Sequence, residues 1–232
     1  LFDWKHVACK HACMRTIVVN SQKGGSGKTA LCAHLSVQAE RSGDGPVYLI
    51  DTDPQGTLSQ WHELRQADSP KRVEVPVEDL VNGVALLAQR GASYCFVDTA
   101  PTRSGETAAL FRLADLVLVP IRPSPSDLWA AAATVALLKA TEVPFLFVLN
   151  QAKASASITA QAAAALSHHG PVAETFVGDR VHYAAAMTDG HTAPELVSTG
   201  PAALEIQGLW KNIKACLHAN TLAIDKVVRA HG

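Results

Sequence analysis

The sequence has no long hydrophobic run and almost no excess of charge of either sign. No apolar stretch approaches the roughly 18 residues of a membrane-spanning helix, and no basic segment with an apolar core opens the chain. These absences argue against a membrane span and against secretion. The net charge of −1 provides no global field for nucleic acid, so DNA binding would need a local basic patch.

Cysteine is also scarce, and its odd number argues against a disulfide framework. The five cysteines therefore indicate reduced, cytosolic thiols: Cys9, Cys13, Cys32, Cys95 and Cys216. Two of them lie near His6 and His11, which raises the question of a zinc site. Those four ligands would have to wrap very tightly around a metal, and no second cluster follows. We therefore favour a disordered leader over residues 1–13.

Apolar runs typical of strands alternate with alanine-rich stretches typical of helices. This alternation predicts an α/β fold, a mostly parallel twisted sheet flanked by helices on both faces. We expect one domain over residues 14–217, followed by a C-terminal tail, residues 218–232. The expected strands are 16–20, 47–51, 94–98, 116–121, 144–150 and 172–176. The expected helices are 28–42, 81–89, 105–114, 127–140, 158–168 and 202–217, and residues 66–76 are expected to form an exposed loop.

A glycine-rich turn, "KGGSGKT", follows the first expected strand and opens a helix. The turn can direct backbone N–H groups into one concavity, and the helix dipole adds positive potential, so the context predicts a phosphate-binding loop. The N–H groups belong to Gly25, Ser26, Gly27 and Lys28. Lys28 would then contact the β and γ phosphates, and the Thr29 hydroxyl would bind Mg²⁺. A glycine-rich turn with a chance Gly-Lys-Thr is the alternative, which the strand–turn–helix context disfavours.

The loop departs from the usual spacing because Gln22 stands where a glycine is expected, and Lys23 follows it. Two ammonium groups beside one loop repel each other unless dense negative charge lies between them. Lys23 therefore suggests additional neutralisation of a triphosphate.

Three aspartates end two of the later strands. Asp51 and Asp53 lie in "DTDPQG", where carboxylates beside a phosphate loop fit hydrolysis assisted by Mg²⁺ or water, or alternatively cap the next helix. Asp98 ends an apolar strand, where a buried carboxylate needs a partner such as the shell of a Mg²⁺ ion.

Lys23, Gly24, Gly25, Ser26, Gly27, Lys28 and Thr29 together resemble the deviant Walker A motif of the ParA/MinD-type ATPases, which are P-loop NTPases. The resemblance implies ATP and Mg²⁺ as cofactors, and a sandwich homodimer in which Lys23 reaches the partner's ATP. Asp51 and Asp53 match the family's switch I, in which Asp53 would orient the attacking water. Asp98 matches Walker B and switch II and would hold Mg²⁺, directly or through water, together with Thr29. Asn150 matches the residue that commonly contacts adenine.

The resemblance extends through "LVLVPIRPSPSDLWAA" and "DRVHYAAAMTDGHT", from residue 14 to about 217. The first of these segments is similar to the small ParA proteins, although its prolines also fit a strand exit followed by a helix start. Nitrogenase-type iron proteins are disfavoured because Cys95 falls in a strand and Cys216 in a terminal helix. The C-terminal segment lacks the aromatic, basic amphipathic character of MinD-like membrane anchors.

Resemblance to small partition ATPases implies that an ATP-bound dimer binds nucleoid DNA non-specifically in the cytoplasm. Slow hydrolysis would then segregate a plasmid, a chromosome or a large cargo, with a ParB-like stimulating partner. We expect no sequence-reading N-terminal DNA domain. The DNA-binding candidates, which fit a solvated helix face equally well, are Lys211, Lys214, Lys226 and Arg229. A MinD-like positioning ATPase, a metabolic P-loop ligase and a nucleotide switch without hydrolysis are the alternatives, and the cargo is not predicted.

Overall fold

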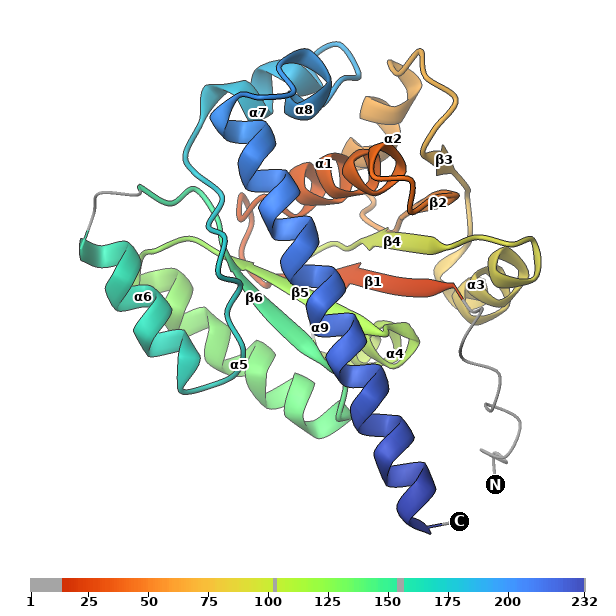
Figure 1. Cartoon of the computed structure of the whole chain (residues 1–232), viewed down its shortest axis with the longest axis vertical. Helices are drawn as coiled ribbons and strands as arrows, with labels where there is room; N and C mark the ends of the chain where they lie inside the picture. The colour runs from red at the N-terminus through yellow and green to blue at the C-terminus, as the bar shows by residue number, and fades with distance from the viewer. Residues whose placement is uncertain (1–13, 102–103, 154–156, 232) are drawn as a thin grey trace.

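A six-stranded parallel sheet forms the centre of the protein (Figure 1). The computed structural model describes residues 14–101, 104–153 and 157–231, so the expected leader with its histidines and cysteines lies outside the described residues. The strand order is β3-β2-β4-β1-β5-β6, with every pair parallel. The strands are β1 (Arg15–Val19), β2 (Val47–Asp51), β3 (Lys71–Arg72), β4 (Tyr94–Asp98), β5 (Leu116–Ile121) and β6 (Phe145–Leu149). The expectation of a parallel α/β fold is confirmed.

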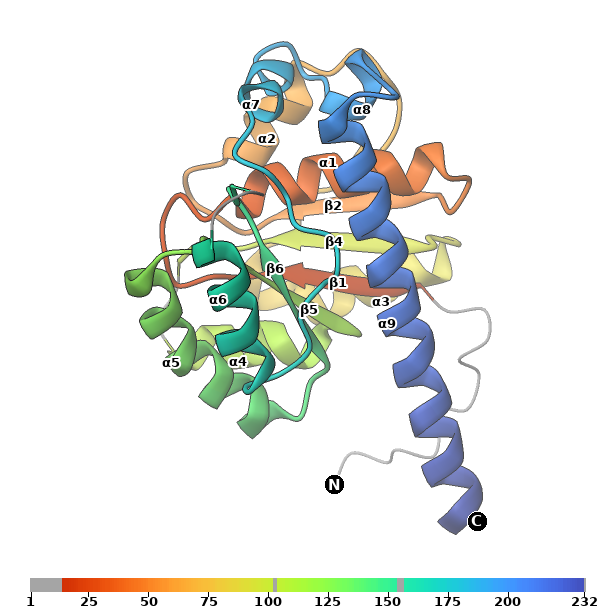
Figure 2. The same cartoon turned by 60° about the vertical axis from the view of Figure 1, so that its left-hand side comes forward.

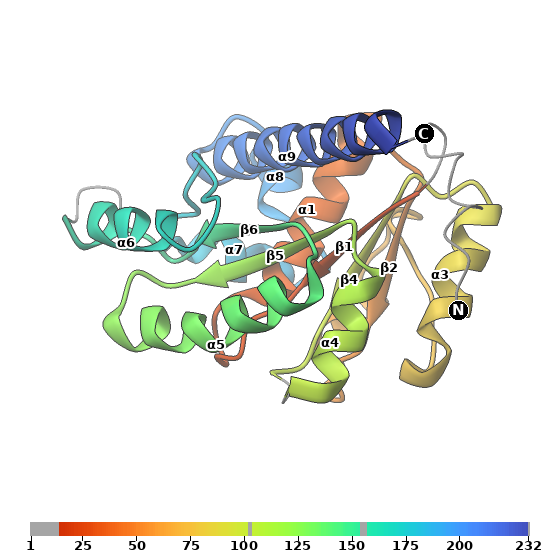
Figure 3. The same ribbon diagram turned by 90° about the horizontal axis from the view of Figure 1, so that it is seen from below.

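Helices cover both faces of the sheet, which explains why the central strands are apolar along their whole length. All six residues of β5 are buried. The helices are α1 (Lys28–Arg41), α2 (Thr57–Glu63), α3 (Leu80–Gln89), α4 (Ser104–Leu113), α5 (Pro125–Thr141), α6 (Ser157–Ser167), α7 (Val181–Met187), α8 (Ala193–Leu196) and α9 (Pro201–His231), with a short 3-10 turn, η2 (Val77–Asp79). The view from below shows α1 and α9 above the sheet and α3, α4 and α5 below it (Figure 3).

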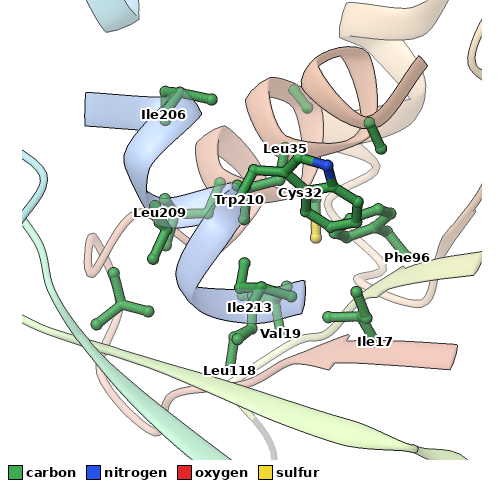
Figure 4. Close-up of a cluster of buried hydrophobic side chains, with 14 of the residues drawn as sticks. Ile17, Val19, Cys32, Leu35, Phe96, Leu118, Ile206, Leu209, Trp210 and Ile213 are labelled. Atoms are coloured by element: carbon green, nitrogen blue, oxygen red, sulfur yellow. The ribbon is translucent and has the colours of Figure 1, made fainter. Parts of the chain in front are cut away.

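The long helix α9 crosses one face of the sheet beside α1 (Figure 2). Its anchor is Trp210, which is 1% exposed and lies among Ile17, Leu35 and Phe96 (Figure 4). The indole N–H of Trp210 donates to the Asp44 carboxylate over 2.7 Å, so its one polar group is paired. Burial of such large apolar side chains fixes α9 against the sheet. The helix continues to His231, through the segment expected to be a tail.

The second apolar core fills the opposite face, between the sheet and helices α3, α4, α5 and α6. Phe111 of α4 and Phe147 of β6 are fully buried there. Among the described residues, no helix is both long enough and apolar enough to cross a membrane.

Two expectations about the sheet were wrong. Residues 172–176 are not a strand: Val172 makes one isolated bridge to Phe147, and the Thr175 N–H turns away to the Asn212 side chain of α9 over 2.9 Å. The Thr175 N–H, which a strand at residues 172–176 would pair with β6, is therefore bonded to α9 instead. Conversely, the expected loop at residues 66–76 contains β3, a two-residue edge strand too short to produce a periodic pattern. Helices α2, α7 and α8 were also not expected.

Because all strands run in one direction, their carboxyl ends meet at a single edge. The segments after β1, β2, β4, β5 and β6 therefore gather there, and they carry the motifs that the sequence singles out.

Candidate functional site

The loop after β1 leads directly into α1 and presents unpaired backbone donors. The N–H groups from Gly24 to Thr29 donate no hydrogen bond to the described part of the protein. Gly27 is the N-cap of α1 at φ 91°, and the first turn of α1 contains no acidic residue. The positive φ favours glycine at this position, and a Cβ there would also force the Asn150 amide to move. A loop of this kind at a helix N-terminus binds anions.

The two lysines of the loop occupy different environments. Lys28 is 7% exposed, and its ammonium group lies 3.5 Å from the Lys23 carbonyl oxygen, so its side chain folds back along the loop. Lys23 is half-buried and lines a crevice with Pro120 and Asp127, on the side of β5 and α5. Its ammonium group has no hydrogen bond or ion pair with the described residues. Only Lys28 is therefore engaged with its own loop.

Thr29, in the first turn of α1, meets Asp98, at the end of β4, the strand next to β1. The Thr29 hydroxyl donates to Asp98 Oδ2 over 2.6 Å, whereas Asp98 Oδ1 is buried without a partner among the described residues. Burial raises the pKa of Asp98 to about 7, although the bond from Thr29 acts in the opposite direction. A hydroxyl and a carboxylate with a free oxygen are suitable ligands for Mg²⁺, directly or through water. The residues present thus fit the ion that the family implies.

The two aspartates of "DTDPQG" do different things. Asp51 accepts from the N–H and the hydroxyl of Ser59, both over 2.9 Å, in the first turn of α2, and from the Asp53 N–H over 3.1 Å. Both oxygens of Asp51 therefore hold this segment, and one of them satisfies an N–H in the first turn of α2. Asp53 is half-buried, and one of its oxygens accepts from the Gln55 N–H over 3.0 Å. Asp53 is thus the carboxylate of this pair that can take another partner.

Side chains after β6 brace the phosphate-binding loop. The Asn150 amide donates to the Ser26 carbonyl over 2.7 Å, and the exposed Gln151 amide donates to the Gly25 carbonyl over 3.0 Å. Gln151 has a φ of 52°, which few residues other than glycine adopt. The structure thus uses Asn150, which the resemblance assigned to adenine, to brace the loop, and the contact from Gln151 was not foreseen.

A cavity of about 260 Å³ opens beside Gly27 and Asn150. Its other lining includes Asp179, Arg180 and Tyr183 from the segment before and within α7. That segment is fixed to α9 because Glu205 accepts from the Gly178 N–H, the Arg180 guanidinium and the Tyr183 hydroxyl. The position next to the loop and the mixed apolar and polar lining suit a nucleotide base. The sequence drew attention to "DRVHYAAAMTDGHT" without assigning these residues.

His34 of α1 also lines this cavity and is held neutral. Its Nδ1 lies 2.8 Å from the Ala30 carbonyl, which can only accept, so Nδ1 carries the hydrogen. Nε2 is buried and has no partner among the described residues. Burial lowers the pKa of His34 from 6.5 to about 4.

Protonation of His34 should make the protein less stable in acid. The unfolded chain takes up this proton below pH 6.5 and the folded protein only near pH 4, so the free energy of unfolding falls across that window. We expect wild type to lose about 2 kcal/mol more than a His34→Gln variant between pH 7 and pH 5, measured by urea unfolding. The contribution of Asp98 to the pH dependence is the same in both proteins, so it cancels in the difference between them. Equal pH dependence of the two proteins would contradict this assignment.

The basic residues considered for DNA binding differ in whether their side chains are available. Lys211 is exposed, but Lys214 is paired with Asp44 over 2.8 Å. The side chains of Lys226 and Arg229 lie outside the described residues. Within the described ranges, no group of three or more His, Cys, Asp or Glu residues could hold a metal ion.

Comparison with known proteins agrees with this geometry. The model of the CobQ/CobB/MinD/ParA nucleotide-binding domain family matches residues 17–218. A curated relative, maintenance of carboxysome distribution protein A from Halothiobacillus neapolitanus, is 30% identical over 199 residues, which cover 82% of this chain and 91% of the relative.

Two solved structures share the fold at lower identity. The MinC:MinD cell division protein complex of Aquifex aeolicus has a TM-score of 0.72 at 18% identity, covering 87% of this chain and 96% of that chain. An ATP complex of a Cyanothece McdA variant has a TM-score of 0.68 at 20% identity, covering 89% and 97%.

Proposed function

The chain belongs to the CobQ/CobB/MinD/ParA nucleotide-binding domain family, and from this membership we propose that it is a small ParA-like positioning ATPase. In this proposal, binding of Mg-ATP drives formation of a sandwich homodimer, and the dimer binds nucleoid DNA non-specifically. Slow hydrolysis then releases the dimer, and a ParB-like or cargo-adaptor partner accelerates that step.

The observation that carries the proposal is the arrangement at the carboxyl edge of the sheet. At the carboxyl ends of the neighbouring strands β1 and β4 lie a loop whose N–H groups are unpaired among the described residues, a buried lysine, and a Thr29–Asp98 pair with an unpartnered oxygen. A triphosphate with its cation satisfies all of these groups at once. A base beside Asn150 would occupy the adjoining cavity.

Each residue then has a distinct role in phosphoryl transfer to water. Thr29 and Asp98 would hold Mg²⁺, which neutralises charge on the β and γ phosphates when bound. Lys28 and the loop N–H groups stabilise the charge that develops on the transferred group, and Asp53 orients the attacking water. Lys23, which has no ion-pair partner among the described residues of its own subunit, would stabilise the same charge on the partner's nucleotide.

The proposed cargo is a large cellular body or a DNA molecule. The relative from Halothiobacillus neapolitanus is named for maintenance of carboxysome distribution, which supports a cargo of that kind. A related match, 29% identical over 133 residues, is the protein ParA of Rhizobium radiobacter. Of the four basic residues considered for DNA contact, Lys211 has an exposed side chain, whereas Lys214 is paired with Asp44.

Mg²⁺-dependent turnover of ATP by the purified protein tests this proposal. We expect slow release of phosphate with Mg-ATP alone and none in EDTA, because the Asp98 and Thr29 oxygens act through the ion. Turnover that requires a small organic substrate would favour a metabolic ligase. Tight binding of ATP without release of phosphate would favour a switch without hydrolysis.

A further inference from the structure

Arg122 is a cation beside the phosphate-binding loop that lies outside the loop motif. It follows β5 directly, and β5 flanks β1 on the side opposite β4. Its Nη1 lies 3.9 Å from the point where a side chain on Gly25 would begin. Arg122 therefore faces the loop from the side opposite the Thr29–Asp98 pair.

The guanidinium of Arg122 is held in a fixed orientation by Asp127. Nε donates to Asp127 Oδ1 over 3.0 Å, and Nη2 donates to Oδ2 over 3.2 Å. The Asp127 side chain is 3% exposed and is itself fixed by the Ser124 hydroxyl over 2.6 Å. Such a two-point bond removes most of the freedom of the arginine. It leaves Nη1, the nitrogen nearest Gly25, without a hydrogen-bond partner among the described residues.

The charges on this side of the loop do not balance. Lys23 and Asp127 line the same crevice, and Arg122 bonds to that aspartate. Arg122 takes that carboxylate, and the Lys23 ammonium makes no ion pair with the described residues. An anion placed against Gly25 would be attracted by the oriented guanidinium, which directs Nη1 toward this position with favourable geometry for phosphate oxygens.

We propose that Arg122 binds the terminal phosphate of the triphosphate held by its own loop and thereby makes the site prefer ATP to ADP. The inference rests on the proposed function and adds to it a specificity-determining residue held by Asp127. The alternative is that Arg122 serves only to fasten the start of α5 to the end of β5.

The two possibilities differ in the ratio of ATP affinity to ADP affinity. An Arg122→Gln variant should bind ATP about 10- to 100-fold more weakly, the range expected for loss of a hydrogen bond to a charged group, with ADP binding unchanged. Competition against a fluorescent ADP analogue measures both affinities. Arg90→Gln is the matched control, because Arg90 is exposed at the end of α3, just before β4 and at the opposite edge of the sheet.

A double variant separates binding from structure, because Arg122→Gln alone leaves a buried carboxylate unpaired. Arg122→Gln/Asp127→Asn removes both charges, so it should regain thermal stability while ATP affinity stays low. Recovery of ATP affinity in the double variant, or equal weakening of ATP and ADP in the single variant, would overturn the inference. If wild type bound neither nucleotide, the proposed function itself would be wrong, independently of the role of Arg122.

Discussion

Replacing Asp53 with alanine is expected to lower ATP turnover by about 100-fold or more, the usual contribution of a positioned acid–base group. Asp53 has one oxygen in a local turn and is otherwise available to orient water. The loop N–H groups and Lys28 are unchanged in this variant, so ATP should still bind. Phosphate release under single-turnover conditions measures the chemical step without the contribution of product release.

Asp51 provides the contrast within the same six-residue motif. Its oxygens are occupied by Ser59 and by the Asp53 backbone, so Asp51→Asn should act on stability, by about 1 kcal/mol as for loss of a helix cap. ATP turnover by the Asp51→Asn variant should fall only to the extent that this segment loses its order. An Asp53→Ala protein that turned over at the wild-type rate would remove Asp53 from the mechanism.

Replacing Lys23 with alanine is expected to abolish ATP-dependent dimerisation while leaving the folded monomer intact. The Lys23 ammonium makes no ion pair with the described residues, so its loss costs the monomer little. In the dimer it would face the partner's triphosphate, where a charge-assisted hydrogen bond stabilises the complex. Light scattering after gel filtration with Mg-ATP, in an Asp53→Ala background that prevents turnover, measures the mass.

Lys28→Ala is the matched control, because Lys28 is buried along its own loop and lies on the same motif. It should lose nucleotide binding itself, whereas Lys23→Ala should still bind ATP as a monomer. A Lys23→Ala protein that dimerised with ATP as wild type does would show that Lys23 acts within its own subunit.

Local sequence pattern predicted most of the sheet and the strand–turn–helix arrangement around "KGGSGKT". A continuous apolar run such as β5 is compatible with few structures other than a buried strand. The turn before Lys28 is specified by its own glycines, which are close together in the sequence. The resemblance named Thr29 and Asp98 as residues that would hold Mg²⁺, but their hydrogen bond was not predicted. It forms because Thr29 opens α1 after β1 and Asp98 ends the neighbouring strand β4.

Contacts between distant segments could not be predicted in the same way. Gln151 reaches the loop because β6 ends beside it, and Arg122 faces Gly25 because β5 lies next to β1. The strand expected at residues 172–176 failed for a similar reason, since Asn212 of α9 takes the Thr175 N–H. Each of these depends on which elements become neighbours, which hydrophobic periodicity does not specify.

Retention of the purified protein on non-specific DNA is the most direct test of the central claim, that an ATP-bound dimer is the form that binds DNA. The account predicts that wild type is retained with Mg-ATP, is released with ADP, and is released by rising salt because the contacts are to phosphates. It predicts that Lys23→Ala is not retained with either nucleotide. Equal retention of wild type with ATP, ADP and no nucleotide, or no retention at all, would contradict it.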